Sequence, residues 1–187
     1  KLVLVDTKGD KVESANATTR LISSDKVVGI LGELTSTNTA QVMAIAEKKQ
    51  IPVISPVATN DKLTEQKQFA NRVCFTDSFQ GAVVANYATK DLKLKTAVVV
   101  SDQAQVYSLG LAKAFKEAFE KAGGKIVKEI KVSSGDKDFK AVVSQIKTAN
   151  PDFMFLPMYH PEVSMIARQA KQIGLVKPMF SGDGVAN

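Results

Sequence analysis

The chain has few of the residues on which catalytic chemistry depends. Its 187 residues include no tryptophan, one cysteine and one histidine. The cysteine, Cys74, lies in an apolar segment that we read as a buried strand, and a single cysteine cannot form an internal disulfide. The glycine-rich phosphate loops of nucleotide-binding enzymes are missing, and no nucleophile–base pair is visible. We therefore expect a protein that is not an enzyme and that binds no cofactor or metal.

Long apolar runs and clusters of arginine are missing as well. No run approaches the roughly 18–20 apolar residues that a membrane-spanning helix needs. The formal net charge is +6, but the lysines are spread over expected helix faces and strand ends, so we expect a solvated surface and no nucleic-acid partner. The chain opens at Lys1 beside an apolar stretch, residues 2–5, that we read as a strand. We therefore expect a fragment whose targeting segment is not included.

Short apolar segments alternate with stretches of helical periodicity along the chain. Several of the segments are continuous runs of β-branched residues, as in Thr96–Val100, which is typical of parallel strands covered on both faces. Between them, Phe139, Val143 and Ile146 lie on one face of an expected helix. The expected strands are residues 2–5, 27–31, 51–54, 73–75, 96–100, 125–132, 152–156 and 178–180. This pattern predicts an α/β protein with parallel sheets flanked by helices.

A polar stretch at residues 60–71, with no clear helix, interrupts the alternation, which restarts at Val73. Two Rossmann-like lobes explain this break better than one continuous sheet. We predict a first lobe over residues 1–76 and a second over residues 77–187.

Three small polar loops follow expected strands, at Gly32–Ser36, Ser55–Thr59 and Ser181–Gly184. Ligands of open α/β sheets bind at the carboxyl ends of the strands, where helix N-termini present backbone N–H groups. Two of the loops offer hydroxyls and amides, which suit a carboxylate. The third offers the carboxylate of Asp183, which suits an ammonium group. An amino acid carries both of these charges.

Seven stretches together carry a family resemblance. They are Gly32–Thr39, Ser55–Thr64, Asp77–Gly81, Asp102–Gly110, Gly135–Phe139, Tyr159–Glu162 and Gly182–Asn187. In this order and spacing, the chain resembles the leucine/isoleucine/valine-binding branch of the bacterial ABC-transporter solute-binding proteins, which have the type I periplasmic-binding fold. The resemblance implies a chain that lacks the first strand and helix of lobe one and the closing third of lobe two.

For lobe one, the resemblance implies a ligand-binding role for two loops. Ser36 would hold the ligand carboxylate with its N–H and hydroxyl at the start of a helix over residues 37–50; the alternative is a simple N-cap. In the second loop, Val57, Ala58 and Thr59 would face the charged head group, with the Val57 carbonyl toward the ammonium. The alternative for this loop is turn chemistry after a Ser-Pro step.

For lobe two, the resemblance implies an ammonium-binding carboxylate and aromatic walls. Asp183 would pair with the ligand ammonium, where close relatives have Glu; the alternative is a turn residue between two glycines. Asp77, at the lobe crossover, would add negative field or cap the helix that begins near Ser78. Tyr107 and Tyr159 would form walls for the ligand side chain, and the alternative for each is packing at a sheet edge.

The function implied by the resemblance is non-enzymatic binding. The protein would capture a small aliphatic amino acid between its lobes and deliver it to an ABC permease in the membrane. It would work in the periplasm or at the outer face of the cell membrane, with a lipid anchor as one option. The alternative is a ligand-sensing domain of a receptor or transcriptional regulator. Incomplete sheets would leave edges exposed, so we also expect the fragment to self-associate.

Overall fold

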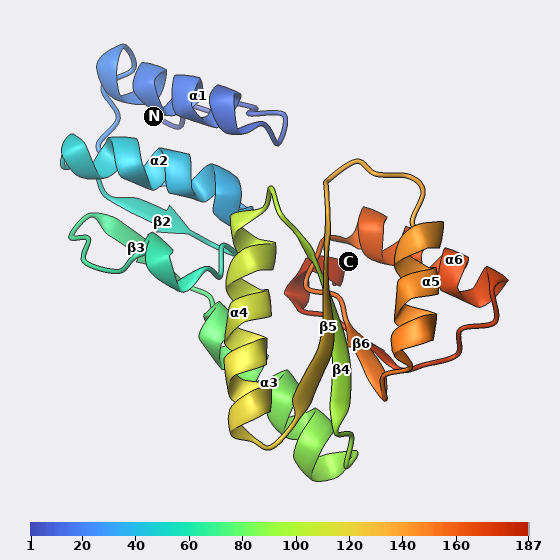
Figure 1. Ribbon diagram of the computed structural model, residues 1–187. Helices are drawn as coiled ribbons and strands as arrows, with labels where there is room; N and C mark the ends of the chain where they lie inside the picture. The colour runs from blue at the N-terminus through green and yellow to red at the C-terminus, as the bar shows by residue number, and fades with distance from the viewer. Residues whose placement is uncertain (187) are drawn as a thin grey trace. The chain divides into compact units, whose positions relative to one another are not determined.

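The computed structural model describes residues 1–186, and its internal contacts divide the chain into two units, Lys1–Thr76 and Asp77–Asn187. Each unit is built on a parallel sheet flanked by helices (Figure 1). The α/β class with parallel sheets that the sequence predicted is therefore confirmed. No helix of residues 1–186 is both long enough and apolar enough to cross a membrane.

The first unit contains a three-stranded parallel sheet. Its strands, in sheet order, are β1 (Ile30–Leu31), β2 (Val53–Ser55) and β3 (Ala70–Arg72). Its helices are α1 (Lys11–Ser23), α2 (Ser36–Lys48) and the short 3-10 helix η1 (Asp61–Leu63). Val42 and Met43 of α2 pack with Val53 of β2 in the buried core. The two strands that lead into the candidate loops, β1 and β2, are thereby packed against α2.

The first unit corrects several sequence expectations. Residues 2–5 form no strand and pair with none of the strands of this sheet, and residues 3–5 line a cavity together with β1. The strand expected at residues 27–31 is reduced to Ile30–Leu31. The third strand forms at Ala70–Arg72 rather than at residues 73–75, because Ala70 pairs with Val53 in register. Cys74 is therefore neither in a strand nor fully buried.

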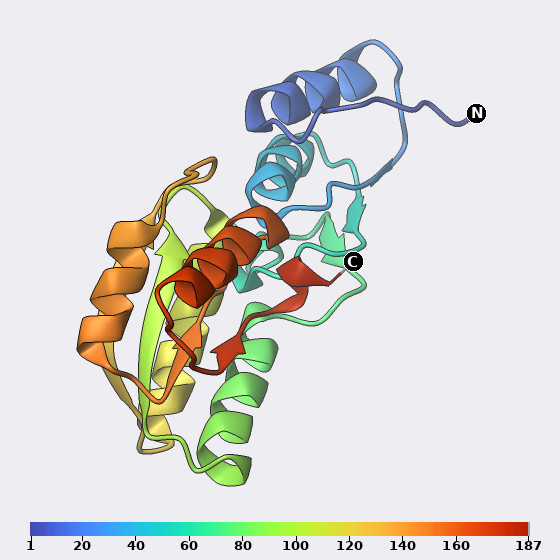
Figure 2. The same ribbon diagram turned by 90° about the vertical axis from the view of Figure 1, so that its right-hand side faces the viewer.

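The second unit contains a four-stranded parallel sheet with helices on both faces (Figure 2). Its strands, in sheet order, are β5 (Lys125–Val132), β4 (Thr96–Asp102), β6 (Phe153–Phe155) and β7 (Met179–Phe180). Its helices are α3 (Asp77–Asn86), continued by the π-helix η2 (Tyr87–Asp91), then α4 (Val106–Lys121), α5 (Lys140–Ala149), α6 (His160–Gln172) and the short 3-10 helix η3 (Asp183–Val185).

Two buried clusters fill the two faces of this sheet. On the side of α3 and α4, Phe115 packs on Phe155 with ring centroids 4.0 Å apart, and Phe153 and Phe119 complete the aromatic group. On the side of α5 and α6, the helices bury the apolar stripes that their spacing predicted, including Ile146. Burial on both faces of the sheet explains why residues 97–100 of β4 are a continuous apolar run.

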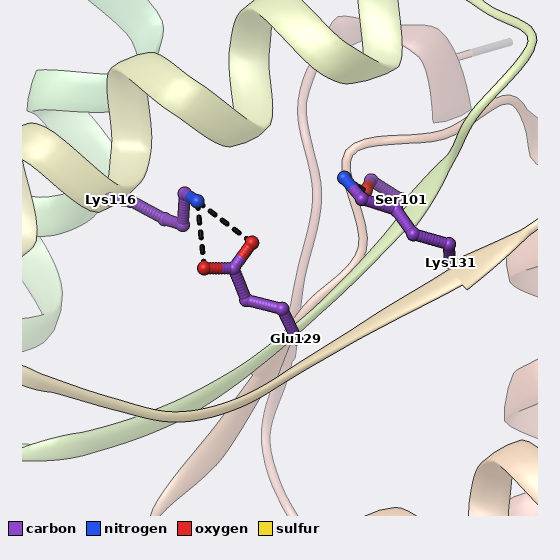
Figure 3. A network of polar contacts seen from close by, with 4 residues as sticks. All are labelled: Ser101, Lys116, Glu129 and Lys131. Carbon is purple, nitrogen blue, oxygen red and sulfur yellow. Dashed lines mark hydrogen bonds and ion pairs between the residues drawn. The ribbon is translucent and has the colours of Figure 1, made fainter.

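Charged side chains line the edge strand β5 (Figure 3). Lys116 Nζ of α4 lies 2.7 Å from both carboxylate oxygens of Glu129. Lys131 Nζ donates a hydrogen bond of 2.8 Å to Ser101 Oγ on β4. Charged residues on an edge strand oppose pairing with another sheet. The β5 edge of the second sheet thus carries charged side chains, whereas the β1 edge of the first carries Leu31, which is 81% exposed.

Candidate functional site

The predicted site residues fall into two groups, one in each unit, and each group is described by itself. The first unit contains Ser36, Val57, Ala58 and Thr59, in the loops that follow β1 and β2. The second unit contains Asp77, Tyr107, Tyr159 and Asp183, at the starts of α3, α4, α6 and η3.

Ser36 is the first helical residue of α2, and Thr35 occupies the N-cap position without a side-chain cap bond. The expectation that Ser36 is the N-cap is therefore wrong by one residue. The Ser36 hydroxyl instead accepts a hydrogen bond of 3.3 Å from the backbone N–H of Asn60. This bond ties the start of α2 to the end of the second loop. Ser36 remains in the first turn, where helix N–H groups have no intrahelical partner and the helix dipole favours an anion.

The second loop folds around the hydroxyl of Ser55. This hydroxyl donates a hydrogen bond of 2.6 Å to the carbonyl of Glu33 and accepts one of 3.2 Å from the N–H of Ala58. Ala58 and Thr59 are buried, whereas Val57 is half-exposed. The loop after β2 is therefore fastened to the loop after β1, as two loops that act on one ligand group would need to be.

Arg72 is a structural residue of this loop that sequence reasoning missed. Its guanidinium donates to the carbonyls of Asn60 (2.8 Å) and Asp61 (2.9 Å) and, more weakly, to that of Ala58 (3.4 Å). It also donates to Thr64 Oγ1 at 2.7 Å. Arginine suits this role because its planar fork presents several donors at fixed angles. An isolated arginine in a lysine-rich chain was the available signal.

In the second unit, Asp183 is held by Gln80. Gln80 Nε2 donates to Asp183 Oδ1 at 2.9 Å, and Gln80 Oε1 accepts from the backbone N–H of Asp183 at 3.1 Å. The same Nε2 lies 3.2 Å from Asp77 Oδ1. Asp77 is fully buried and is the first residue of α3. The structure thus brings two predicted residues together through a third, Gln80, which the sequence analysis did not single out.

Tyr107 and Tyr159 stack on each other with ring centroids 5.0 Å apart. Tyr107 is only 2% exposed, and its hydroxyl accepts a hydrogen bond of 3.0 Å from the N–H of Gly184. Burial raises the pKa of the Tyr107 hydroxyl well above its ordinary value of 10, and the neighbouring carboxylate of Asp183 raises it further. Tyr107 therefore stays protonated at neutral pH. Its ring is a packing element as well as a neighbour of Asp183, whereas Tyr159 is only half-buried.

A cavity of about 790 Å³ lies elsewhere in the first unit, between residues 3–7, α1, β1 and α2. None of the predicted site residues line it. Its wall includes Asn38, whose Nδ2 is buried and has no hydrogen-bond partner among residues 1–186. Within those same residues, no group of three or more histidine, cysteine, aspartate or glutamate side chains could hold a metal ion.

Known proteins match this chain over almost its whole length. Residues 1–186 match the family described as periplasmic binding protein. The Leu/Ile/Val-binding protein of Escherichia coli K12 is 33% identical over 176 residues, which is 94% of this chain and 48% of that protein. The chain spans about half the length of the curated relatives it matches.

Two solved structures have the same fold at higher identity. A leucine-binding protein of Thermotoga maritima superimposes with a TM-score of 0.96 at 41% identity, over 98% of this chain and 52% of that one. A branched-chain amino acid transporter substrate-binding protein of Streptococcus pneumoniae, solved in complex with isoleucine, gives a TM-score of 0.89 at 37% identity, with the same coverage. The fold is that of the type I periplasmic-binding proteins, and the chain belongs to the periplasmic binding protein family.

Proposed function

We propose that this chain forms part of an amino-acid-binding protein that serves an ABC importer and takes a small aliphatic amino acid. One observation carries the proposal. The carboxylate of Asp183 is half-buried, is fixed by the neutral amide of Gln80, and forms no ion pair within residues 1–186. A carboxylate held in this way without a cation suits a ligand that brings its own positive charge, because a buried charge is stable only when it is paired.

Each unit, taken by itself, offers groups suited to the charged ends of an amino acid. The hydroxyls of Ser36 and Thr59, together with the first-turn N–H groups of α2, would hold the carboxylate. In the second unit, Asp183 would pair with an ammonium group. In the first unit, the carbonyl of Val57 would accept a hydrogen bond from such a group. Protein groups that are already fixed in place would then pair with both charges of the ligand. This limits the conformational entropy that is lost on binding.

The remaining predicted residues would shape the rest of the site. Ala58 lies buried between two binding residues and leaves room for them, and Asp77 stands behind Gln80 and adds negative field. Tyr159, stacked on Tyr107, would face the aliphatic side chain of the ligand. The proposal includes no chemical step, and its membrane partner is an ABC permease. The place of action would be the periplasm or the outer face of the cell membrane. The relatives named above are all binding proteins.

The test is a melting-temperature scan of the full-length protein against the twenty amino acids, followed by calorimetry. A ligand that binds only the native state raises its stability, by about 2.7 kcal/mol at 100 times the Kd. We expect leucine, isoleucine or valine to raise the Tm and to be recovered unchanged after incubation. A flat scan, or chemical conversion of the amino acid at an enzyme-like rate, would overturn the proposal.

A further inference from the structure

The partners of the Gln80 side chain require a neutral group at this position that can both donate and accept hydrogen bonds. Its nitrogen faces two carboxylate oxygens, those of Asp183 (2.9 Å) and Asp77 (3.2 Å), and its oxygen faces the backbone N–H of Asp183 (3.1 Å). The opposite amide orientation would set an oxygen against two carboxylates and an NH2 group against an N–H, so these partners assign the orientation. Glutamate here would add a third negative charge, and leucine would supply no hydrogen bond.

The loop that carries Asp183 is packed tightly against this amide. A Cβ on Gly182 would lie 2.7 Å from Gln80 Oε1, 2.6 Å from the Tyr107 hydroxyl and 2.5 Å from Leu111 Cδ2. On the other side of Asp183, the N–H of Gly184 donates to the Tyr107 hydroxyl. The segment is thus held before and after Asp183. Gln80 is the residue that contacts both the backbone and the carboxylate of Asp183.

We propose that Gln80 is the positioning residue of the ammonium site, holding the Asp183 carboxylate at a fixed rotation while leaving its charge unneutralised. This inference rests on the proposed function. A lysine or arginine in the same place would also hold the carboxylate, but would cancel the charge that attracts the ligand. Glutamine fixes the Asp183 carboxylate with hydrogen bonds alone. Its second N–H donates to Asp77, which offsets part of the repulsion between the two carboxylates.

The experiment is a double-mutant cycle on the full-length protein, with L-leucine as the probe and calorimetry or NMR titration as the measurement. Gln80→Leu should weaken leucine binding by about 10- to 100-fold, the range expected for lost hydrogen bonds to a charged group. In the Asp183→Ala background the same substitution should change affinity by no more than about twofold, because the group that Gln80 positions is gone.

Gln169→Leu is the matched control. The Gln169 amide also makes two hydrogen bonds in the second unit, accepting from the N–H of Phe139 (2.7 Å) and donating to the carbonyl of Lys137 (3.0 Å), and neither bond is with the Asp183 loop. It should leave leucine affinity within about twofold. If Gln80→Leu does not fold, Gln80→Glu replaces it in the cycle, because it keeps the acceptor for the Asp183 N–H and adds repulsion.

Three results would overturn the proposal. A Gln80 variant that binds leucine like wild type, or a loss equally large in the Asp183→Ala background, shows that Gln80 does not act through Asp183. An equal loss in Gln169→Leu shows a general effect on the fold. Each of these leaves the proposed function standing. A wild-type protein that binds no amino acid overturns the proposed function, and this inference with it.

Discussion

Gly81→Ala tests how closely α3 and α4 must approach. A Cβ built on Gly81 lies 2.7 Å from the backbone N of Phe115 and 2.9 Å from the backbone carbonyl carbon of Ala114. Both neighbours are main-chain atoms of α4, so no side-chain rotation can relieve the contact. The two helices would have to move apart, and the aromatic packing of Phe115 on Phe155 would loosen with them.

Two opposing effects determine how much Gly81→Ala changes the free energy of unfolding. Alanine is favoured over glycine inside a helix by about 1 kcal/mol, so propensity alone predicts a more stable protein. Overpacking of a well-packed contact costs about 1–3 kcal/mol, and contacts with backbone atoms place this one toward the upper end of that range. The steric cost should exceed the gain in helix propensity, so the free energy of unfolding should fall by about 1–2 kcal/mol.

The assay is urea unfolding of the full-length protein, followed by circular dichroism. Gly29→Ala is the matched control, because a Cβ there meets its nearest atom, the carbonyl oxygen of Pro52, at an ordinary 3.6 Å. That variant should stay within about 0.5 kcal/mol of wild type. A Gly81→Ala protein as stable as wild type, or more stable, would show that α3 and α4 do not pack as closely as described.

Three further predictions follow from particular contacts. Asp183→Ala should cost about 3–5 kcal/mol of amino-acid affinity, because it leaves the ligand ammonium unpaired. Tyr107→Phe should cost less, about 1–2 kcal/mol, because it removes only the hydrogen bonds of the hydroxyl to the Gly184 N–H and to Asp183; equal losses in calorimetry would refute the head-group assignment. Hydrogen bonds from the backbone N–H groups of Lys95 and its neighbour hold the pKa of Asp152 below its ordinary 3.8. The unfolded state therefore takes up this proton first, so acid-unfolding curves should show stability falling below about pH 4, less steeply in Asp152→Asn. Leu31→Lys should reduce self-association of the 187-residue chain through the exposed β1 edge, and unchanged sedimentation would argue against pairing at that edge.

The strands show where sequence patterns suffice and where they do not. Residues 97–100 of β4 form a continuous apolar run, and the structure places them inside the sheet with helices on both faces. Residues 2–5 are apolar as well but form no strand, and they pair with none of the strands of the first sheet. A strand is defined by hydrogen bonds to a neighbour, so composition can indicate a strand but cannot supply the partner.

In the candidate site, too, some features could be predicted from the sequence and others depend on distant partners. Loops at strand ends could be predicted from polar residues that follow apolar runs, and the structure places Ser36, Thr59 and Asp183 in or beside such loops. The residues that fix these loops were not predicted. Gln80 reaches Asp183 across 103 positions of sequence, and Arg72 binds carbonyls whose direction only the folded backbone determines. A long polar side chain gives no local signal of such a distant partner.

Arg72 and Gln80 each hold another group of the protein in place, and the charge of the held group explains which residue type is suitable. In the first unit, the carbonyls held by Arg72 are neutral, so a cation can hold them without weakening a ligand charge. Asp183 is different, because its negative charge is what would attract an ammonium. A cation there would compete with the ligand, and in a chain with a net charge of +6 cations are abundant. A glutamine keeps the charge available, since its hydrogen bonds fix the carboxylate without neutralising it.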